Sequence, residues 1–214
     1  KNDYFEVDKS QNTRNQLPDI PQYGIREVAN YKYVYGPEYL PDIPGKPKFF
    51  GLAVIEQVDL TRRFKLAHEA LWAGGQLNPS EAFDELDKLI FCKIWDERKP
   101  RKVGEPYDFQ IITVSKSEVP DETKRRIKEN ENLHNRIKAL YEEGRKKDAE
   151  VFRDDIRLAP EKIRTVVSYL ESVNLSETDL DSKGRAFETF MGSFFRGNFG
   201  QYFTPREIVK FIVD

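Results

Sequence analysis

Cysteine, histidine, methionine and long apolar runs are all scarce in this sequence of 214 residues. The single cysteine, Cys92, excludes an internal disulfide and is typical of a reducing compartment. It lies in the apolar run 89–92, so we expect a buried thiol rather than a nucleophile. No run of about eighteen apolar residues and no signal peptide occurs, which predicts a cytoplasmic protein without a membrane partner.

Metal-ligand clusters and familiar nucleophile motifs are also missing from the sequence. His68 and His134 stand alone on expected helices, without Cys, His or carboxylate neighbours at the spacing of a zinc site. There is no phosphate-binding glycine loop of the nucleotide-hydrolase kind and no Ser-His-Asp arrangement. We therefore expect no bound metal and find no support for these classes of hydrolase.

A charge excess of one sign is absent from the chain as a whole. The 35 Lys and Arg residues are balanced by 37 Asp and Glu residues, so overall charge gives no support for nucleic-acid binding. Residues 124–164 differ, because they hold 13 basic and 9 acidic residues. This local excess suits either contact with DNA or a solvated helix face. The basic segment 98–102 suits either a phosphate contact or a solvated connection.

Residues 1–57 are rich in proline and tyrosine, and we expect an irregular arm or linker with little β structure. Six prolines between residues 18 and 47 exclude a long helix, and only the alternating segment 31–35 is a candidate for a short strand. Aromatic and basic residues interleave in this arm. They suit either tyrosines that pack on the next domain or aromatic rings that stack on nucleic-acid bases.

Residues 58–196 are predicted to form a mainly α domain, a helical bundle, because their apolar residues recur at helical spacing. The expected helices cover residues 58–73, 79–98, 121–147, 151–157, 160–173 and 180–196. Residues 109–114 are the best strand candidate in this domain, although a short apolar connection between helices fits them as well. The expected core residues are Leu60, Phe64, Leu71, Trp72, Phe83, Leu86, Leu89, Ile90, Ile94, Trp95, Leu133, Ile137, Leu140, Tyr141, Ile163, Val166, Val167, Leu170, Phe187, Phe190, Met191, Phe194 and Phe195.

The last stretch, residues 197–214, reads GNFGQYFTPREIVKFIVD and combines a glycine-containing loop with the start of a helix. Thr204 is the expected N-cap, Pro205 takes the first helical position, and Glu207 completes a capping box. By itself this pattern describes an ordinary capped helix start. A helix N-terminus of this kind also suits a carboxylate or another anion, because it presents free N–H groups.

The string GQYFTPREIV resembles the segment that opens the catalytic domain of the N-6 adenine DNA methyltransferases. The modification subunits of type I restriction systems and the related fused restriction–modification enzymes are the most similar members. The upstream string DLDSKGRAFETFMGSFF is similar to the helix that precedes this segment in the family. Its matching residues are Asp181, Gly184, Phe187, Glu188 and Phe190. The resemblance is strong over residues 180–214 and looser over residues 58–98.

This resemblance implies that the chain is the N-terminal part of such an enzyme, with residues 58–196 preceding the catalytic domain. Residues 197–214 would be the truncated start of that domain, including its first helix. The implied cofactor is S-adenosylmethionine, and the implied partners are double-stranded DNA and specificity and restriction subunits or fused domains. The residues implied to bind the cofactor are Gln201, Tyr202, Phe203, Thr204, Pro205 and Arg206.

The family's base-binding motif, Asn/Asp-Pro-Pro-Tyr/Phe, does not occur in these residues, nor does its glycine-containing cofactor loop. We therefore expect a fragment of a longer polypeptide, with no catalytic residue of its own and no methyltransferase activity alone. The alternative is a non-catalytic helical module for DNA or protein contacts, whose last residues match the family by chance.

Overall fold

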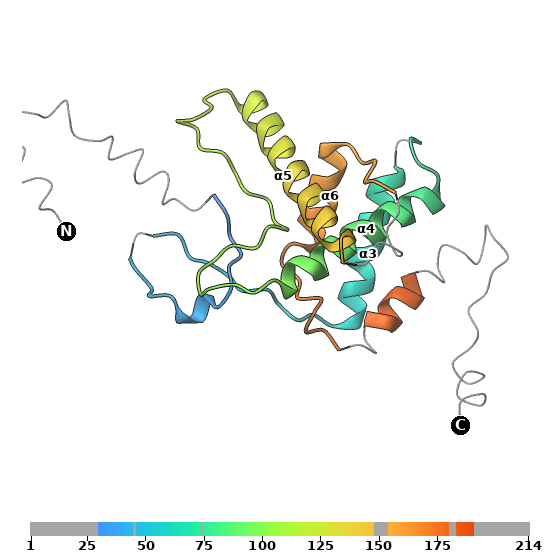
Figure 1. Cartoon of the computed structure of the whole chain (residues 1–214), viewed down its shortest axis with the longest axis horizontal. Helices are drawn as coiled ribbons and strands as arrows, with labels where there is room; N and C mark the ends of the chain where they lie inside the picture. Colours follow the sequence, from blue (N-terminus) through green and yellow to red (C-terminus); the bar gives the residue numbers. More distant parts are fainter. Residues whose placement is uncertain (1–29, 45, 74, 148–153, 180–182, 191–214) are drawn as a thin grey trace, which may run out of the picture.

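A computed structural model describes residues 30–44, 46–73, 75–147, 154–179 and 183–190 of the chain. Most of the described chain is helical, and Figure 1 shows the helices gathered into a bundle beside an irregular arm. The named helices are η2 (Pro37–Tyr39), α3 (Gln57–Trp72), α4 (Pro79–Arg98), α5 (Glu122–Arg145) and α6 (Pro160–Leu170). Residues 183–190 are helical as well. The prediction of a mainly α bundle is therefore confirmed.

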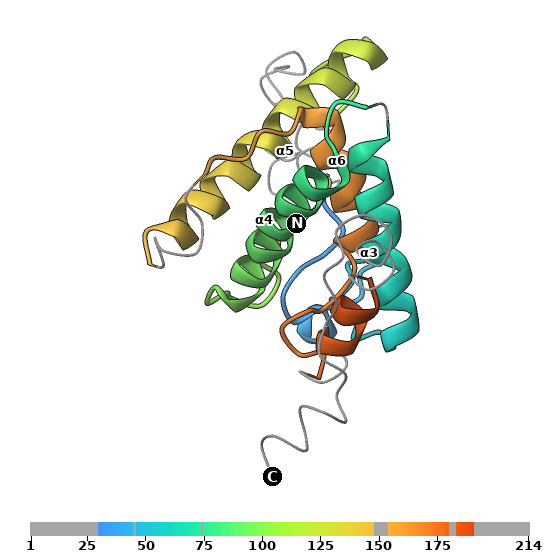
Figure 2. The ribbon, with the colours of Figure 1, turned by 90° about the vertical axis from the view of Figure 1, so that its right-hand side faces the viewer.

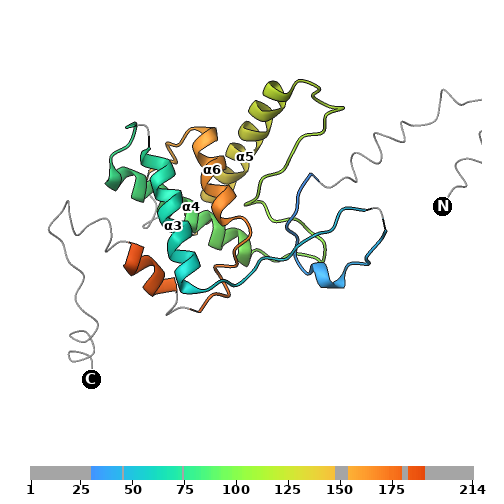
Figure 3. The ribbon, with the colours of Figure 1, turned by 180° about the vertical axis from the view of Figure 1, so that it is seen from behind.

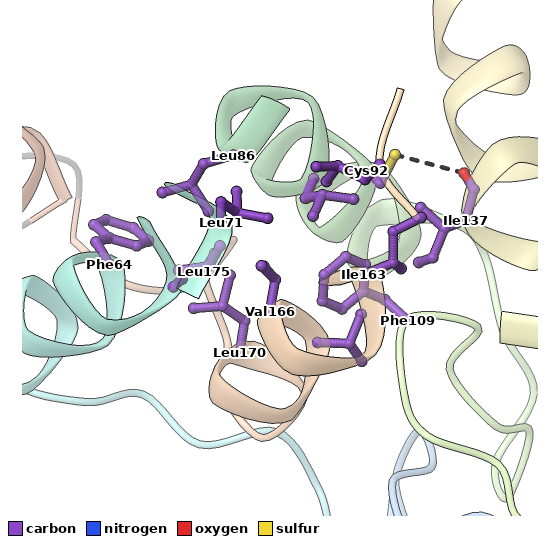
Figure 4. Packing of buried hydrophobic residues seen from close by; sticks show 14 of the residues in the cluster. Phe64, Leu71, Leu86, Cys92, Phe109, Ile137, Ile163, Val166, Leu170 and Leu175 are labelled. Atoms are coloured by element: carbon purple, nitrogen blue, oxygen red, sulfur yellow. Dashed lines mark hydrogen bonds between the residues drawn. The ribbon is translucent and has the colours of Figure 1, made fainter. Parts of the chain in front are cut away.

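The short helix α6 lies at the centre of the bundle. It packs against α3, α4 and α5, while α3 and α5 each pack against α4 (Figure 2). Figure 4 shows Ile163, Val166 and Leu170 of α6 pointing into the same core as Leu71 of α3 and Leu86 of α4. All five side chains are at most 1% exposed. Burial of apolar surface on this scale is the main force that holds the four helices together.

Side-chain caps fix where two of the long helices begin. Asn78 accepts a hydrogen bond from the Glu81 amide, and the Glu81 carboxylate accepts one from the Asn78 amide, both at 2.9 Å. This is the expected capping box, and it starts α4 at Pro79. Asp121 caps α5 in a similar way by accepting from the Lys124 amide at 2.7 Å. The predicted start of α4 is thus confirmed, and α5 begins at the residue after its cap.

The predicted core is largely confirmed, with one clear error in α3. Every core residue predicted on α5 and α6 is buried. Trp72, which we placed in the core, is 42% exposed. The buried stripe of α3 runs through Leu60, Phe64, His68 and Leu71. Trp72 follows Leu71 directly and therefore points about 100° away from this stripe.

One predicted helix is absent from the described residues, the strand candidate 109–114 is instead the connection between helices that we considered, and α6 is shorter than expected. Residues 154–159 are not helical, so the helix expected at 151–157 does not form over its described part. The sequence 109–114 contains no strand, and β pairing in the described chain is limited to three isolated bridges. The helix α6 ends at Leu170 rather than at residue 173.

Residues 109–114 form no strand because carboxylates, rather than a neighbouring strand, accept hydrogen bonds from their backbone. These carboxylates come from three different parts of the bundle. The pairs are Phe109 with Asp96 (2.9 Å), Ile111 with Glu171 (2.7 Å) and Val114 with Glu129 (2.9 Å). Burial raises the pKa of Asp96 and of Glu171, and the bonds from the amides oppose that rise. The segment is thus an irregular connection threaded between helices.

The arm, residues 30–56, is attached to the bundle through the buried side chain of Gln110. The Gln110 Oε1 atom accepts from the amides of Lys32 and Tyr33, both at 2.9 Å. Its Nε2 atom donates to the carbonyls of Tyr33 at 2.7 Å and Tyr107 at 2.8 Å. The four bonds satisfy the amide completely, as its burial requires. Figure 3 shows the arm beside the bundle.

The tyrosines of the arm are divided between packing and exposure. Tyr31 stacks on Phe49 with ring centroids 5.5 Å apart. Tyr35 and Tyr39 are 48% and 74% exposed. Within the described part of residues 31–35, bridges at Tyr33 and Val34 replace the short strand that we considered. The arm is therefore irregular, and only some of its aromatic rings pack on other residues.

The helices α4 and α5 approach each other closely at Gly144. A methyl group at this position would lie 2.3 Å from Cε1 of Phe91 and 2.5 Å from its Cζ. The Phe91 ring has little room to move, because it stacks on Trp95 and meets Tyr141 edge-on. Glycine at residue 144 is therefore required by packing.

We expect Gly144→Ala to destabilise the protein by about 1–3 kcal/mol, because the added methyl group overpacks this contact. In an unhindered helix the same change would stabilise by about 1 kcal/mol. Urea unfolding measures the difference, and Phe91→Leu provides the control because it removes the clashing ring atoms. Equal effects of Gly144→Ala in the wild-type and Phe91→Leu backgrounds would contradict this explanation.

A second prediction concerns Asp87 on α4, whose pKa is raised to about 6 by burial and by the nearby charge of Asp84. The folded state binds the proton of the Asp87 carboxyl group more tightly than the unfolded state does. The stabilisation from this protonated group is therefore full below the unfolded pKa and is lost as the pH rises through about 6. We expect Asp87→Asn to raise the free energy of unfolding by about 2 kcal/mol above that pH.

The gain should vanish below about pH 3, because there the pH lies below the unfolded pKa of 3.8 as well and Asp87 is protonated in both states. Chemical unfolding across this pH range checks the prediction. Asp84→Asn is the comparison variant, because it removes an exposed charge one turn away that contributes less than burial does to the raised pKa of Asp87. Its effect should be smaller, whereas a pH-independent gain from Asp87→Asn would argue against a titrating group.

Candidate functional site

The residues implied to bind the cofactor lie outside the described residues, as does the whole of residues 197–214. They are Gln201, Tyr202, Phe203, Thr204, Pro205 and Arg206. The part of the site region that the structure describes is the helix 183–190, which precedes them in sequence. Its contacts with the bundle are therefore the structural information closest to the predicted site.

The helix 183–190 lies beside α3 (Figure 2), and phenylalanine rings connect it to α3 and α4. Phe190 is fully buried and stacks on Phe83 of α4, with ring centroids 5.8 Å apart. Phe187 meets Phe64 of α3 edge-on at 6.3 Å and Phe83 at 5.6 Å. Aromatic pairs at these distances contribute about 0.5–1.5 kcal/mol each beyond their buried area. The predicted packing of Phe187 and Phe190 is confirmed, while Met191, Phe194 and Phe195 lie outside the described residues.

His68 of α3 completes this aromatic cluster. Its ring lies 5.5 Å from the ring of Phe190, and its Nε2 atom lies 2.9 Å from the carbonyl oxygen of Pro79. Burial lowers the pKa of His68, which favours the neutral ring with Nε2–H donating to that carbonyl. His68 thus connects the start of α4 to the docked helix. This arrangement gives it a structural role.

The basic segment 98–102 is held by contacts within the protein. The Arg101 side chain is only 4% exposed, donates to the Asp96 carboxylate and lies over the Tyr107 ring at 4.6 Å. Lys99 pairs with Asp108 at 3.4 Å and with Glu143 at 3.0 Å. These two cations anchor the segment. Arg98 and Lys102 are exposed, so a solvated connection and a phosphate contact both stay open for them.

Most of the basic residues in the described part of 124–164 are likewise bound inside the molecule. They pair with carboxylates or donate to backbone carbonyls. The contacts are Arg125 with the Val119 and Pro120 carbonyls, Lys128 with Glu118, Arg136 with the Asp108 and Gln110 carbonyls, Arg145 with Glu142 and Asp155, Arg157 with Glu85, Lys162 with the Ala70 and Ala73 carbonyls, and Arg164 with Glu129. The local excess of positive charge therefore does not form one free basic face.

The buried ionisable groups of α4 are also used for structure. Lys93 pairs with Glu97 at 3.1 Å, and both side chains are at most 2% exposed. Burial lowers the pKa of Lys93. The Cys92 thiol lies 3.7 Å from the Ile137 carbonyl oxygen (Figure 4), and burial raises its pKa. The expectation of a buried thiol is confirmed, and its raised pKa disfavours the reactive thiolate.

A surface hollow of about 670 Å³ lies between the beginnings of α5 and α6. Sequence reasoning missed it, because its lining comes from separate segments. The basic run at residues 124–128 was the one signal, since Arg125 and Arg126 both line the hollow. Glu161 and Arg164 reach it only through the folding of α6 against α5.

The described residues hold no group of three or more His, Cys, Asp or Glu side chains placed to bind a metal ion. None of the helices in this part of the chain is both long and apolar enough to cross a membrane. No protein-family model matches the sequence, and no curated protein matches it.

We expect Phe190→Ala to release the helix 183–190 from the bundle, because it removes a fully buried ring shared by Phe83 and His68. The loss of stability should be about 3 kcal/mol. Hydrogen exchange should accelerate at amides 183–190 while those in the middle of α5 stay protected. Thr189→Ala, an exposed neighbour on the same helix, is the control. Uniformly faster exchange in all helices would show that the ring supports the whole core instead.

Proposed function

We propose that this chain is the N-terminal part of a DNA methyltransferase that transfers a methyl group from S-adenosylmethionine to N6 of adenine in double-stranded DNA. The observation that carries the proposal is the string GQYFTPREIV at residues 200–209, preceded at residues 179–195 by a string that resembles the family's upstream helix. The helical bundle adds support, because the resemblance implies a helical domain at this position. The proposed protein acts with specificity and restriction subunits or with fused domains.

The residues of the string have the chemistry that such a cofactor requires. Its methionyl end carries a carboxylate, for which Thr204 offers a hydroxyl group and the adjoining helix start offers N–H groups. Its sulfonium and adenosyl parts suit the aromatic surfaces of Tyr202 and Phe203, because a cation is attracted to an aromatic face. Pro205 fixes the backbone at the first helical position and so reduces the conformational freedom lost on binding.

The docked helix 183–190 gives the bundle a role in this proposal. Phe187 and Phe190 attach it to α3 and α4, so the chain enters the predicted cofactor segment from an anchored helix. An anchored entry reduces the entropy that the segment loses when it orders around a ligand. On this hypothesis the bundle supports the cofactor segment, while the base-binding motif is supplied by residues beyond this chain.

The proposal is tested with the complete protein that contains this chain. We expect it to transfer labelled methyl groups to N6 of adenine in double-stranded DNA, and we expect the 214-residue chain alone to transfer none. A complete protein that neither binds S-adenosylmethionine nor modifies DNA would refute the proposal. It would favour the alternative, a helical module for DNA or protein contacts.

In the complete protein, Thr204→Ala should weaken the binding of S-adenosylmethionine several-fold, measured by calorimetric titration. The reason is that the hydroxyl group contacts the ligand as well as capping the helix. Glu207→Ala is the matched control, since it removes the other half of the capping box and should cost only about 1 kcal/mol of stability. Thr204→Ser keeps the hydroxyl group and should retain affinity. Equal dissociation constants for the wild type and Thr204→Ala would leave Thr204 with a capping role alone.

A further inference from the structure

The hollow between α5 and α6 is lined by charged groups of both signs. The groups that matter for its chemistry are Glu122, Arg126, Glu129, Asn130, Glu161 and Arg164. Its volume, about 670 Å³, is within the range of about 300–1,000 Å³ found for small-molecule sites. The hollow is independent of the proposed cofactor segment, because none of its lining residues belongs to residues 197–214.

Arg164 is a buried cation that lines this hollow. It is 9% exposed, and its Nη1 atom donates to Glu129 at 3.1 Å and to Asn130 at 3.2 Å. Glu129 is fixed in turn, because it accepts from the Val114 amide at 2.9 Å. No acceptor among the described residues takes a bond from Nε or Nη2 of Arg164. A guanidinium group with fixed orientation and spare donors suits a phosphate or carboxylate group.

Arg126 and Glu122 stand four residues apart on α5 and both line the hollow. This spacing normally permits an ion pair, yet neither side chain forms an ion pair or hydrogen bond within the described chain. The Glu161 carboxylate on the α6 side accepts one long contact from the described residues, at 3.4 Å from Asn130. The hollow therefore offers one exposed cation and two exposed carboxylates around the buried Arg164.

The mixture of charges decides which ligand class fits. Arginine side chains bind an anionic group, whereas the carboxylates of Glu122 and Glu161 accept hydrogen bonds from hydroxyl groups. The same carboxylates repel an extended polyanion such as duplex DNA. A small molecule that combines one phosphate group with several hydroxyl groups satisfies both requirements.

We propose that this hollow binds a sugar phosphate, with its phosphate group on Arg126 and Arg164 and its hydroxyl groups on Glu122 and Glu161. The sugar phosphate is either free or part of a nucleoside monophosphate, since the two share this chemistry. Ile127, which lines the hollow and is 49% exposed, offers an apolar contact for the base of a nucleotide. The two sources are separated by comparing ribose 5-phosphate with adenosine 5′-monophosphate.

The experiment is a calorimetric titration of the 214-residue chain with these two probes and with inorganic phosphate. Arg126→Gln should weaken the binding of both probes at least ten-fold. Lys124→Gln is the matched control, because Lys124 is exposed in the same helical turn but does not line the hollow. Its dissociation constants should stay close to those of the wild type. Circular dichroism checks that each variant keeps its helical content.

A second variant, Glu122→Gln, separates the hydroxyl contacts from the phosphate contact. It should weaken the binding of ribose 5-phosphate several-fold while leaving that of inorganic phosphate unchanged or stronger, because a repulsive charge is removed. Tighter binding of the nucleotide than of ribose 5-phosphate would assign the nucleotide as the ligand, and equal binding would assign the free sugar phosphate.

Three outcomes would overturn the proposal. The first is no saturable binding of either probe at millimolar concentration. The second is an equal loss of affinity in Arg126→Gln and Lys124→Gln, which would indicate unspecific attraction to positive charge. The third is a preference for a short DNA duplex over both probes, which would make the hollow part of a nucleic-acid surface.

Discussion

The described fold depends on buried carboxylates that accept hydrogen bonds from the backbone of the connections between helices. An irregular segment inside a helical bundle leaves its N–H groups without partners, and each unsatisfied group costs about 1–3 kcal/mol. Side chains on or next to the helices remove this cost. The carboxylates and the amides they accept from are Glu85 with Arg157, Asp96 with Phe109, Glu97 with Leu175 and Ser176, Glu129 with Val114, and Glu171 with Ile111. The bundle can therefore bury part of a long non-helical connection, namely Tyr107, Phe109 and Gln110.

The distance in sequence between these carboxylates and the amides they bind explains which parts of the fold could be predicted from the sequence. Helix starts at Asn78 and Asp121 depend on residues three positions apart, and the buried stripes of α5 and α6 depend on spacing along one helix. Both kinds of information are local. The conformation of residues 109–114 depends on carboxylates up to 60 residues away, so the apolar segment fitted both a strand and a connection between helices, and the sequence alone did not decide between them. The prediction that Trp72 is buried was wrong for a simpler reason. It relied on the hydrophobicity of the side chain and neglected its position on the helix.

The same buried carboxylates also determine where several of the basic side chains lie. Buried carboxylates need cations nearby, and Arg101, Arg157 and Arg164 each pair with a carboxylate that also accepts from a backbone amide. A count of basic residues in the sequence therefore overestimates the charge available to a partner such as DNA. The hollow at Arg126 differs, because its exposed charges remain unpaired within the described chain. Its lining comes from separate segments, so composition could not predict the site.

The two sites raised by this chain thus differ in what the sequence can show. The proposed cofactor segment is contiguous, with its expected cap, proline and aromatic residues within six positions, so a string of letters is enough to suggest its chemistry. The packing of the preceding helix on the bundle is not local in sequence. Phe187 and Phe190 contact Phe64 and Phe83, which lie more than 100 residues earlier in the chain. Those rings join two regions that the resemblance covers with different strength, residues 58–98 and residues 180–214. A change in the bundle that loosened these rings would therefore release the helix 183–190, which precedes the proposed cofactor segment in the sequence.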